Sequence, residues 1–261
     1  MNIVKEFKEA IKITGGVRPD KDSEFIVDMR DDYKSDLINS VISSELYFSK
    51  FRDNAYYFGY SFNESASRND RARFIEWLKT QAKITNQIRE FINRPLIRLE
   101  RMGVIDNIEL VVYPDDRENR LVRLIIESLY SVVKGANFES VTAIKNTPSE
   151  IGVDYNALRA TSRDDYQYKA RKEVVDDLLN KIHSLEYFSL AKNVYTKYRP
   201  YITNYLKFNS EEARILSSIE DGNVLIVDDI NTSGSTLNEV INQIHKINKD
   251  CKIYIFTLIG K

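Results

Sequence analysis

Hydrophobic and polar positions alternate along the carboxyl-terminal half of the chain in a way that predicts short buried strands joined by amphipathic helices. The apolar runs that predict strands lie at 108–113, 141–144, 201–208, 224–227 and 252–258. Apolar residues also recur every three or four positions over 121–133 and 237–247, which is typical of helices. Helices that alternate with strands return the chain over a parallel sheet. The pattern therefore predicts an α/β fold in three layers, with a mostly parallel, doubly wound sheet and a ligand site at the carboxyl ends of its strands.

The connection between the second and third predicted strands is unusually long. More than fifty residues, about 146–198, lie there, whereas most connections in compact domains have only a few. Apolar residues keep helical spacing from Val175 to Leu185. This segment therefore predicts an insertion that is at least partly a packed helix.

The first hundred residues show a weaker pattern. An apolar run at 55–62 predicts a strand, and Ser67 is a candidate N-cap for a helix whose apolar face extends to Phe91. No repeat or low-complexity linker separates this region from the rest of the chain. We therefore expect residues 1–101 to form a helix-rich hood or subdomain on a core of residues 102–261.

Composition and charge narrow the classes of function. With 43% hydrophobic and 30% charged residues among 261, the chain can bury a core and differs from disordered proteins. The 38 Lys and Arg against 39 Asp and Glu leave a net charge of −1, and residues 1–60 carry nine basic and eleven acidic side chains. This balance predicts no nucleic-acid partner.

Cysteine content and hydropathy indicate the cellular compartment in which the protein is expected. The single cysteine, Cys251, excludes an intrachain disulfide and, with only two histidines in the chain, disfavours a zinc site. No apolar stretch approaches the roughly 18 residues of a membrane span. We expect a cytoplasmic protein in a reducing compartment, without membrane contact.

The segment from Val224 to Leu237 carries the most specific chemistry. Its aliphatic strand ends at Asp228 and Asp229, whose carboxylates only accept hydrogen bonds and suit a sugar diol or a hydrated Mg²⁺. The loop that follows is Thr232-Ser233-Gly234-Ser235-Thr236. Its hydroxyls donate hydrogen bonds, and its glycine lets backbone N–H groups approach an anion at the start of the next helix. Acids beside an anion site indicate a ligand with both a phosphate and a diol, as in phosphorylated ribose.

At these fourteen positions the sequence resembles the signature of the type I phosphoribosyltransferases, which bind 5-phosphoribosyl-1-pyrophosphate (PRPP). The resemblance implies that Asp228 and Asp229 are catalytic and bind the ribose 2- and 3-hydroxyls. It implies that the 5-phosphate is bound by Thr232, Ser233, Gly234, Ser235 and Thr236. It also implies an Mg²⁺-dependent pentosyltransferase that moves phosphoribose to a nitrogenous, nucleobase-like acceptor and releases pyrophosphate.

The same residues are also compatible with a purely structural turn. An ordinary strand-to-helix connection, in which Asp and Ser side chains cap the helix, needs no ligand. A Walker phosphate loop is a poor competitor, because no lysine follows Gly234.

Outside this segment the resemblance is weaker. The pyrophosphate loop of the family would correspond to 113–119, where Asp116 and Arg117 are candidates for pyrophosphate contacts. Lys145, just after the second predicted strand, is a further cation candidate at the same edge of the sheet. The acids of the loop would need Mg²⁺ to screen them from pyrophosphate, and no side chain stands out as a direct metal ligand. A solvated turn explains the loop equally well, and a lone lysine such as Lys145 is more often solvent-facing.

Several functions stay open on the sequence alone. A phosphoribosyltransferase is favoured, a non-catalytic PRPP- or nucleotide-sensing regulator of the same fold is the first alternative, and hydrolysis or pyrophosphoryl transfer is the second. The slightly acidic amino-terminal region suits a DNA-binding regulator badly. The sequence names no acceptor base, and it is compatible with a homodimer.

Overall fold

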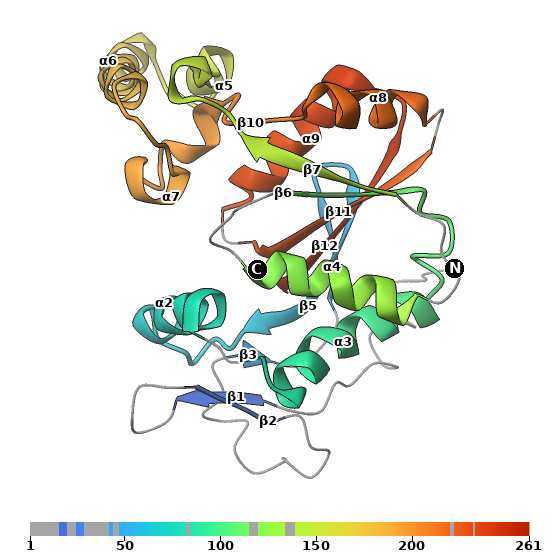
Figure 1. The fold of residues 1–261 in the computed structure, drawn as a ribbon. Coiled ribbons are helices and arrows are strands. Elements are labelled where there is room, and N and C mark those ends of the chain that lie inside the picture. The colour runs from blue at the N-terminus through green and yellow to red at the C-terminus, as the bar shows by residue number, and fades with distance from the viewer. Residues whose placement is uncertain are drawn as a thin grey trace. The chain divides into compact units, whose positions relative to one another are not determined.

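The computed structural model describes residues 16–19, 25–28, 42–43, 47–81, 84–114, 120–133, 139–219, 222–231 and 233–260 (Figure 1). The chain divides into two compact units, which are described one after the other. Unit 1 comprises residues 1–140, 221–232 and 251–261, and unit 2 comprises residues 141–220 and 233–250.

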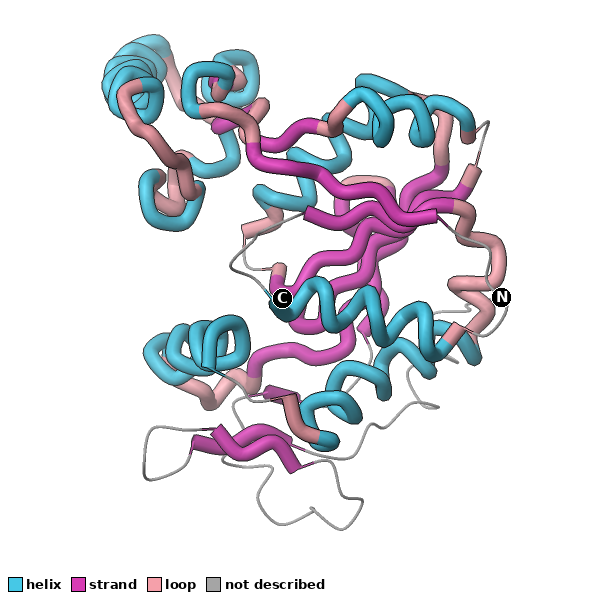
Figure 2. The backbone as a smooth tube through the Cα atoms, viewed as in Figure 1, coloured by secondary structure: helices cyan, strands magenta, loops and turns pink. Residues whose placement is uncertain are grey.

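Unit 1 is built on a mostly parallel sheet. Its parallel strands, in spatial order, are β6 (Leu110–Pro114), β11 (Asn223–Ile230), β12 (Lys252–Gly260) and β5 (Asn54–Phe62). Two further strands pair antiparallel with β5, namely β3 (Ile42–Ser43) and β4 (Tyr47–Phe51). A separate antiparallel pair is formed by β1 (Gly16–Pro19) and β2 (Phe25–Asp28). The predicted α/β class with a mostly parallel sheet is confirmed, and the strands are drawn in magenta in Figure 2.

The position of β5 differs from the expectation for the amino-terminal region. This strand comes from residues 1–101, yet it pairs in parallel with β12 near the carboxyl-terminal end of the sequence. Five strands of the described structure come from residues 1–101, so this region is not purely a helix-rich hood. Unit 1 combines residues from both sides of the expected boundary at 101.

Helices cover one face of this sheet. They are α2 (Arg68–Glu76), the π-helical turn η2 (Trp77–Gln81), α3 (Asn86–Arg101) and α4 (Arg120–Val132). Helix α3 packs on α4 and β5, while α4 packs on β11 and η2. Apolar side chains from these helices and from β5, β11 and β12 form one buried core, which includes Phe91, Leu99, Ile125, Leu225 and Phe256. This core fixes β11 from one side.

The single helix expected from Ser67 to Phe91 is wrong, because the chain forms α2, η2 and α3 in its place. Ser67 does cap α2, since its hydroxyl accepts a hydrogen bond from Asp70 N at 3.1 Å. A second cap then starts α3, where Thr85 Oγ1 accepts from Ile88 N at 3.3 Å. Two caps within one apolar pattern begin two helices.

Helix α3 contains a proline whose missing donor is replaced by a tyrosine. Pro95 has no N–H, so the carbonyl of Phe91, four residues earlier, lacks its usual helical partner. Tyr60 Oη donates to Phe91 O at 2.8 Å, and the two rings stack with centroids 4.2 Å apart. A Cβ on the neighbouring Gly59 would lie 2.7 Å from Pro95 Cγ, so glycine is required where β5 passes the proline ring.

Unit 2 contains the long insertion and the helix that follows β11. Its strands are β7 (Glu139–Lys145, which begins in unit 1), β8 (Gly152–Val153), β9 (Ile202–Thr203) and β10 (Leu206–Lys207). Its helices are η3 (Pro148–Glu150), α5 (Tyr155–Ala160), α6 (Asp165–His183), α7 (Leu190–Asn193), η4 (Arg199–Tyr201), α8 (Ser210–Ser218) and α9 (Ser235–Ile247). Strand β7 pairs antiparallel with β10, and β8 with β9. The helix expected near 175–185 is part of α6, and α9 lies where a helix was expected.

The strand expected at 201–208 is wrong, because it is divided into β9 and β10. Asn204, between them, has φ +59°, a left-handed conformation that asparagine tolerates better than most residues. The buried Glu239 of α9 accepts from Gln243 Nε2 at 2.6 Å and from the backbone at Asn204 and Leu206. Burial raises the pKa of Glu239. The turn is therefore held by a buried carboxyl group.

Within the described residues, no helix is both long and apolar enough to cross a bilayer.

Candidate functional site

The paired acids lie at the carboxyl end of β11, between β6 and β12 in the sheet of unit 1. The aliphatic residues before them, Val224 to Val227, are all buried and hold the strand in the core. Asp228 and Asp229 are themselves buried, with exposures of 7% and 2%. Carboxyl ends of parallel strands are the usual place for ligands in such sheets, so both acids lie where the sequence predicted a site.

Each carboxylate is fixed by the backbone that follows it. Asp228 Oδ1 accepts from Asp229 N at 2.9 Å, and Asp229 Oδ1 accepts from Ile230 N at 2.6 Å. Asp229 Oδ2 forms an ion pair with Lys79 Nζ at 2.8 Å. Burial, and then the charge of Asp229, raise the pKa of Asp228, while Lys79 opposes the rise. The pair is thus desolvated, oriented and partly neutralised.

A buried polar network lies beside the acids and connects β5, β12 and the residue that follows β11. Tyr56 Oη lies 2.8 Å from Thr257 Oγ1, and Asn231 Nδ2 donates to Tyr56 Oη at 3.1 Å. Thr257 is the register partner of Asp228 in β12, so the hydroxyl and the carboxyl group occupy neighbouring positions. Burial raises the pKa of Tyr56. The network holds Asn231, the residue that follows β11, in place.

The glycine loop is described from Ser233 onward, in unit 2, and Thr232 lies outside the described residues. Gly234 is the N-cap of α9 with φ +72° and has no side chain to cap the helix, while Ser233 Oγ accepts from Ser235 N at 3.5 Å. Ser233 Oγ and Ser235 Oγ lie 3.0 Å apart, and Thr236 lies in the first turn of α9. The first turn of a helix presents backbone N–H groups, which is the geometry that binds anions at helix starts.

The candidates for pyrophosphate contacts are placed only in part. Asp116 and Arg117 lie outside the described residues. Lys145 ends β7, and its Nζ hydrogen-bonds Tyr187 Oη at 2.7 Å. This lysine already has a partner in unit 2.

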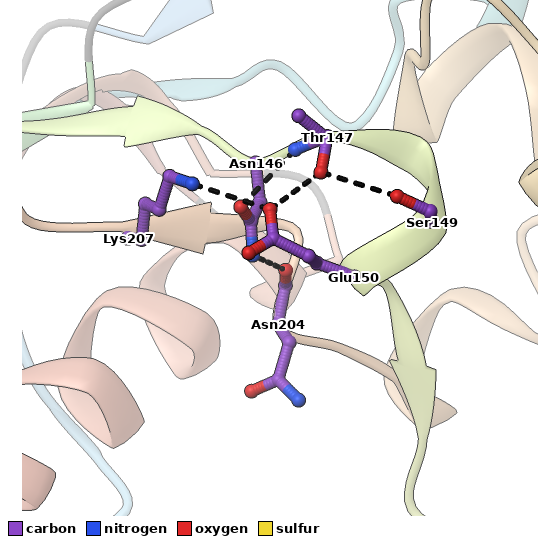
Figure 3. Close-up of polar contacts among 6 residues, drawn as sticks. All are labelled: Asn146, Thr147, Ser149, Glu150, Asn204 and Lys207. Atoms are coloured by element: carbon purple, nitrogen blue, oxygen red, sulfur yellow. Dashed lines mark hydrogen bonds and ion pairs between the residues drawn. The ribbon is translucent and has the colours of Figure 1, made fainter.

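The turn after Lys145 is a network of short polar contacts (Figure 3). Asn146 Nδ2 donates to Asn204 O at 3.0 Å, and Thr147 Oγ1 donates to Glu150 Oε2 at 2.5 Å. Lys207 Nζ contacts the same Glu150 oxygen at 3.2 Å. The hydrogen bond from Thr147, and then Lys207, lower the pKa of Glu150. These side chains connect β7, η3 and β10 and serve the local structure of unit 2.

The acid pair on its own does not complete a Mg²⁺ site among the described residues. Three of its four carboxylate oxygens already accept from Asp229 N, Ile230 N and Lys79 Nζ. Mg²⁺ needs a near-octahedral set of oxygen ligands. Among the described residues, no group of three or more His, Cys, Asp or Glu side chains is arranged to hold a metal ion.

A cavity in the described structure lies away from the motif. It has a volume of about 500 Å³ in unit 2 and is lined mainly by α6 and by residues 192–199. None of the residues predicted for the site lines it. The acids and the glycine loop are therefore better evidence for a function than the size of this cavity.

Sequence reasoning missed two residues from the amino-terminal region: Lys79, which contacts Asp229, and Tyr56, which contacts Asn231 and Thr257 beside the acids. Lys79 follows the buried pair Trp77 and Leu78, a context that gives no sign of a functional lysine. Tyr56 is one of sixteen tyrosines. Only the parallel pairing of β5 with β12 would have placed it beside the motif.

Comparison with known proteins bears on the carboxyl-terminal part of the chain. The family model of the phosphoribosyl transferase domain matches residues 184–261. Among solved structures, a hypoxanthine phosphoribosyltransferase from Staphylococcus aureus is similar with 12% identity, over 72% of this chain and 71% of that chain, at a TM-score of 0.35. No curated protein matches the chain. Residues 184–261, which include the acids and the glycine loop, therefore match the phosphoribosyl transferase family, and the resemblance predicted from Val224 to Leu237 is confirmed.

Proposed function

We propose that the protein is a phosphoribosyltransferase that takes PRPP as donor and a nitrogenous, nucleobase-like compound as acceptor, and releases pyrophosphate. The single observation that supports this most is the segment Val224 to Leu237, in which a buried strand ends in two desolvated acids and a helix starts at a left-handed glycine. The match of residues 184–261 to the phosphoribosyl transferase family supports the same reaction class.

In this proposal, Asp228 and Asp229 accept hydrogen bonds from the ribose 2- and 3-hydroxyls. Their carboxyl oxygens lie near the anomeric carbon, where an oxocarbenium-like transition state develops positive charge. Ser233, Ser235 and Thr236, with the backbone N–H groups at the start of α9, bind the 5-phosphate. The chain's own contribution is therefore positioning and charge stabilisation.

Mg²⁺ enters in this proposal as part of the substrate, bound to the pyrophosphate of PRPP. The three engaged carboxylate oxygens support this assignment over a protein-bound ion. Arg117 and Lys145 are proposed to approach the departing pyrophosphate. We also propose that the protein acts in the cytoplasm, and that a homodimer is the form to test first by light scattering.

The test combines binding and turnover. Isothermal titration calorimetry with the Mg²⁺ complex of PRPP should give saturable binding to the full chain. The double variant Asp228→Asn with Asp229→Asn should lose it, while Asp53→Asn, an exposed acid in unit 1, should keep it. Pyrophosphate release is then measured with a panel of purines, pyrimidines and pyridine or pyrimidine carboxylates.

The outcome separates an enzyme from a sensor. Pyrophosphate release with one class of acceptor supports the transferase and names its acceptor. Tight PRPP binding with no release for any acceptor would replace it by the sensing regulator. Absence of binding in the wild type would remove both.

A further inference from the structure

Lys79 brings a positive charge to the acid pair from a distant part of the sequence. Its Nζ lies 2.8 Å from Asp229 Oδ2. The side chain of Asp229 is 2% exposed, whereas that of Lys79 keeps 33% of its surface in solvent. The ammonium group thus links a buried carboxylate to the surface of unit 1.

The backbone around Lys79 is anchored on both sides. The preceding Trp77 and Leu78 are buried in the core of unit 1, and the ring of Trp77 stacks on Phe74 with centroids 6.0 Å apart. The following Thr80 donates from Oγ1 to Glu76 O at 2.7 Å. The turn is π-helical, a rare conformation that is frequent at functional sites. The position of the ammonium therefore follows from a fixed turn as well as from a long side chain.

The charge of Lys79 changes what the acid pair can bind. A divalent cation that approached the carboxylate of Asp229 would lie within a few ångströms of the ammonium, and like charges repel. A neutral diol meets no such repulsion, since its hydroxyl groups donate to the carboxylates and carry no charge.

We propose that Lys79 is the resident cation of the acid pair and a specificity-determining residue, which makes the pair a site for a neutral sugar diol and excludes a divalent metal ion. The inference rests on the proposed function only for the identity of the diol as ribose. The exclusion of the metal stands on the ion pair itself.

The test removes the ammonium and titrates metal alone. In calorimetry with Mg²⁺ and no other ligand, the wild type should show no saturable binding. Lys79→Met keeps the length of the side chain and exposes two close carboxylates, so it should gain saturable Mg²⁺ binding, tighter by roughly tenfold or more than any wild-type affinity. Lys50→Met, an exposed lysine on β4, is the matched control and should behave as the wild type. Lys79→Arg restores the charge and should again exclude Mg²⁺.

A second readout uses ribose 5-phosphate, which carries the diol and the phosphate but no pyrophosphate. The wild type should bind it equally well with and without Mg²⁺, whereas binding to Lys79→Met should depend on Mg²⁺. Equal behaviour of the two proteins in both titrations would overturn the proposal. So would saturable Mg²⁺ binding by the wild type that Asp228→Asn abolishes, a result that needs no folded Lys79→Met protein.

The two proposals fail in different ways. If the wild type binds neither PRPP nor ribose 5-phosphate but Lys79→Met gains Mg²⁺, the proposed function is wrong and the exclusion of metal by Lys79 holds. If PRPP binds and is turned over but Lys79→Met gains no Mg²⁺, the function holds and the role of Lys79 is wrong.

Discussion

Replacing Asp228 by asparagine tests whether the site is as desolvated as its burial indicates. The carboxyl group is 7% exposed and lies beside Asp229, and its pKa is raised from 3.8 to about 8, first by burial and then by that neighbouring charge. Asparagine keeps an acceptor for the Asp229 N–H and stays neutral at every pH. The variant therefore removes the charge and retains the hydrogen bond.

The sign and size of the effect follow from proton linkage. A folded pKa above the unfolded one means that the folded protein holds the proton while the unfolded chain releases it, so the wild type loses stability as pH rises from about 4 to about 8. Each pH unit in that window costs about 1.4 kcal/mol, which gives an upper bound of about 6 kcal/mol over the whole window. Near pH 8, we expect the free energy of unfolding of Asp228→Asn to be about 2–4 kcal/mol higher than that of the wild type. Near pH 4 the two proteins should be equal.

Urea unfolding of both proteins at several pH values between about 4 and 9 measures this difference. Asp53→Asn, on the exposed turn between β4 and β5, is the control and should follow the wild type at every pH. Free energies of unfolding that run parallel for the wild type and Asp228→Asn across the window would refute the reasoning, because the acid would then ionise as it does in water.

Three further predictions concern the backbone and the buried polar groups. Gly234→Ala should lower the free energy of unfolding, measured in urea, by about 1–2 kcal/mol, since a side chain is strained at φ +72°. It should also weaken PRPP binding in calorimetry. Unchanged values of both would show that the left-handed conformation of Gly234 is not required. Tyr60→Phe leaves Phe91 O without its donor and should lower the free energy of unfolding by about 1–3 kcal/mol. This loss should shrink in a Pro95→Ala background, where the helix regains a backbone N–H at position 95. Equal losses in both backgrounds of this double-mutant cycle would show that the tyrosine does not replace the missing helical donor. Burial raises the pKa of Glu239, so the free energy of unfolding of Glu239→Gln should equal or exceed that of the wild type near pH 8, and the advantage should be lost near pH 4. A variant that is less stable than the wild type near pH 8 would show that the ionised carboxylate is needed.

The part of the site that the sequence predicts well is local in the chain. Strand β11 and helix α9 lie where the apolar run and the helical spacing predicted them. The reason is that the four aliphatic residues and the glycine determine the conformation of the segment in which they stand. Asp228 and Asp229 are at the predicted end of the strand for the same reason. The structure of this contiguous segment is therefore determined mainly by its own residues.

What the sequence does not predict depends on contacts between distant residues. Lys79 has no local pattern that distinguishes it from a solvent-facing lysine, and only the packing of Trp77 and Leu78 brings it to Asp229. The division of 201–208 into two strands follows from the left-handed Asn204 and the buried Glu239, which is more than thirty positions away. In each case a tertiary contact overrides the local preference.

The pairing of β5 with β12 has a consequence for how the chain acquires its structure. Tyr56 and Thr257, which meet across these strands, are 201 positions apart in the sequence. At about 5–20 residues per second, a ribosome needs roughly 10–40 s to make the stretch between them. During that time the apolar face of β5 has no parallel partner, and non-local pairings of this kind form slowly. We expect the nascent chain to depend on chaperones or on low temperature for its yield, and the site around Asp228 to form only after the last strand is complete.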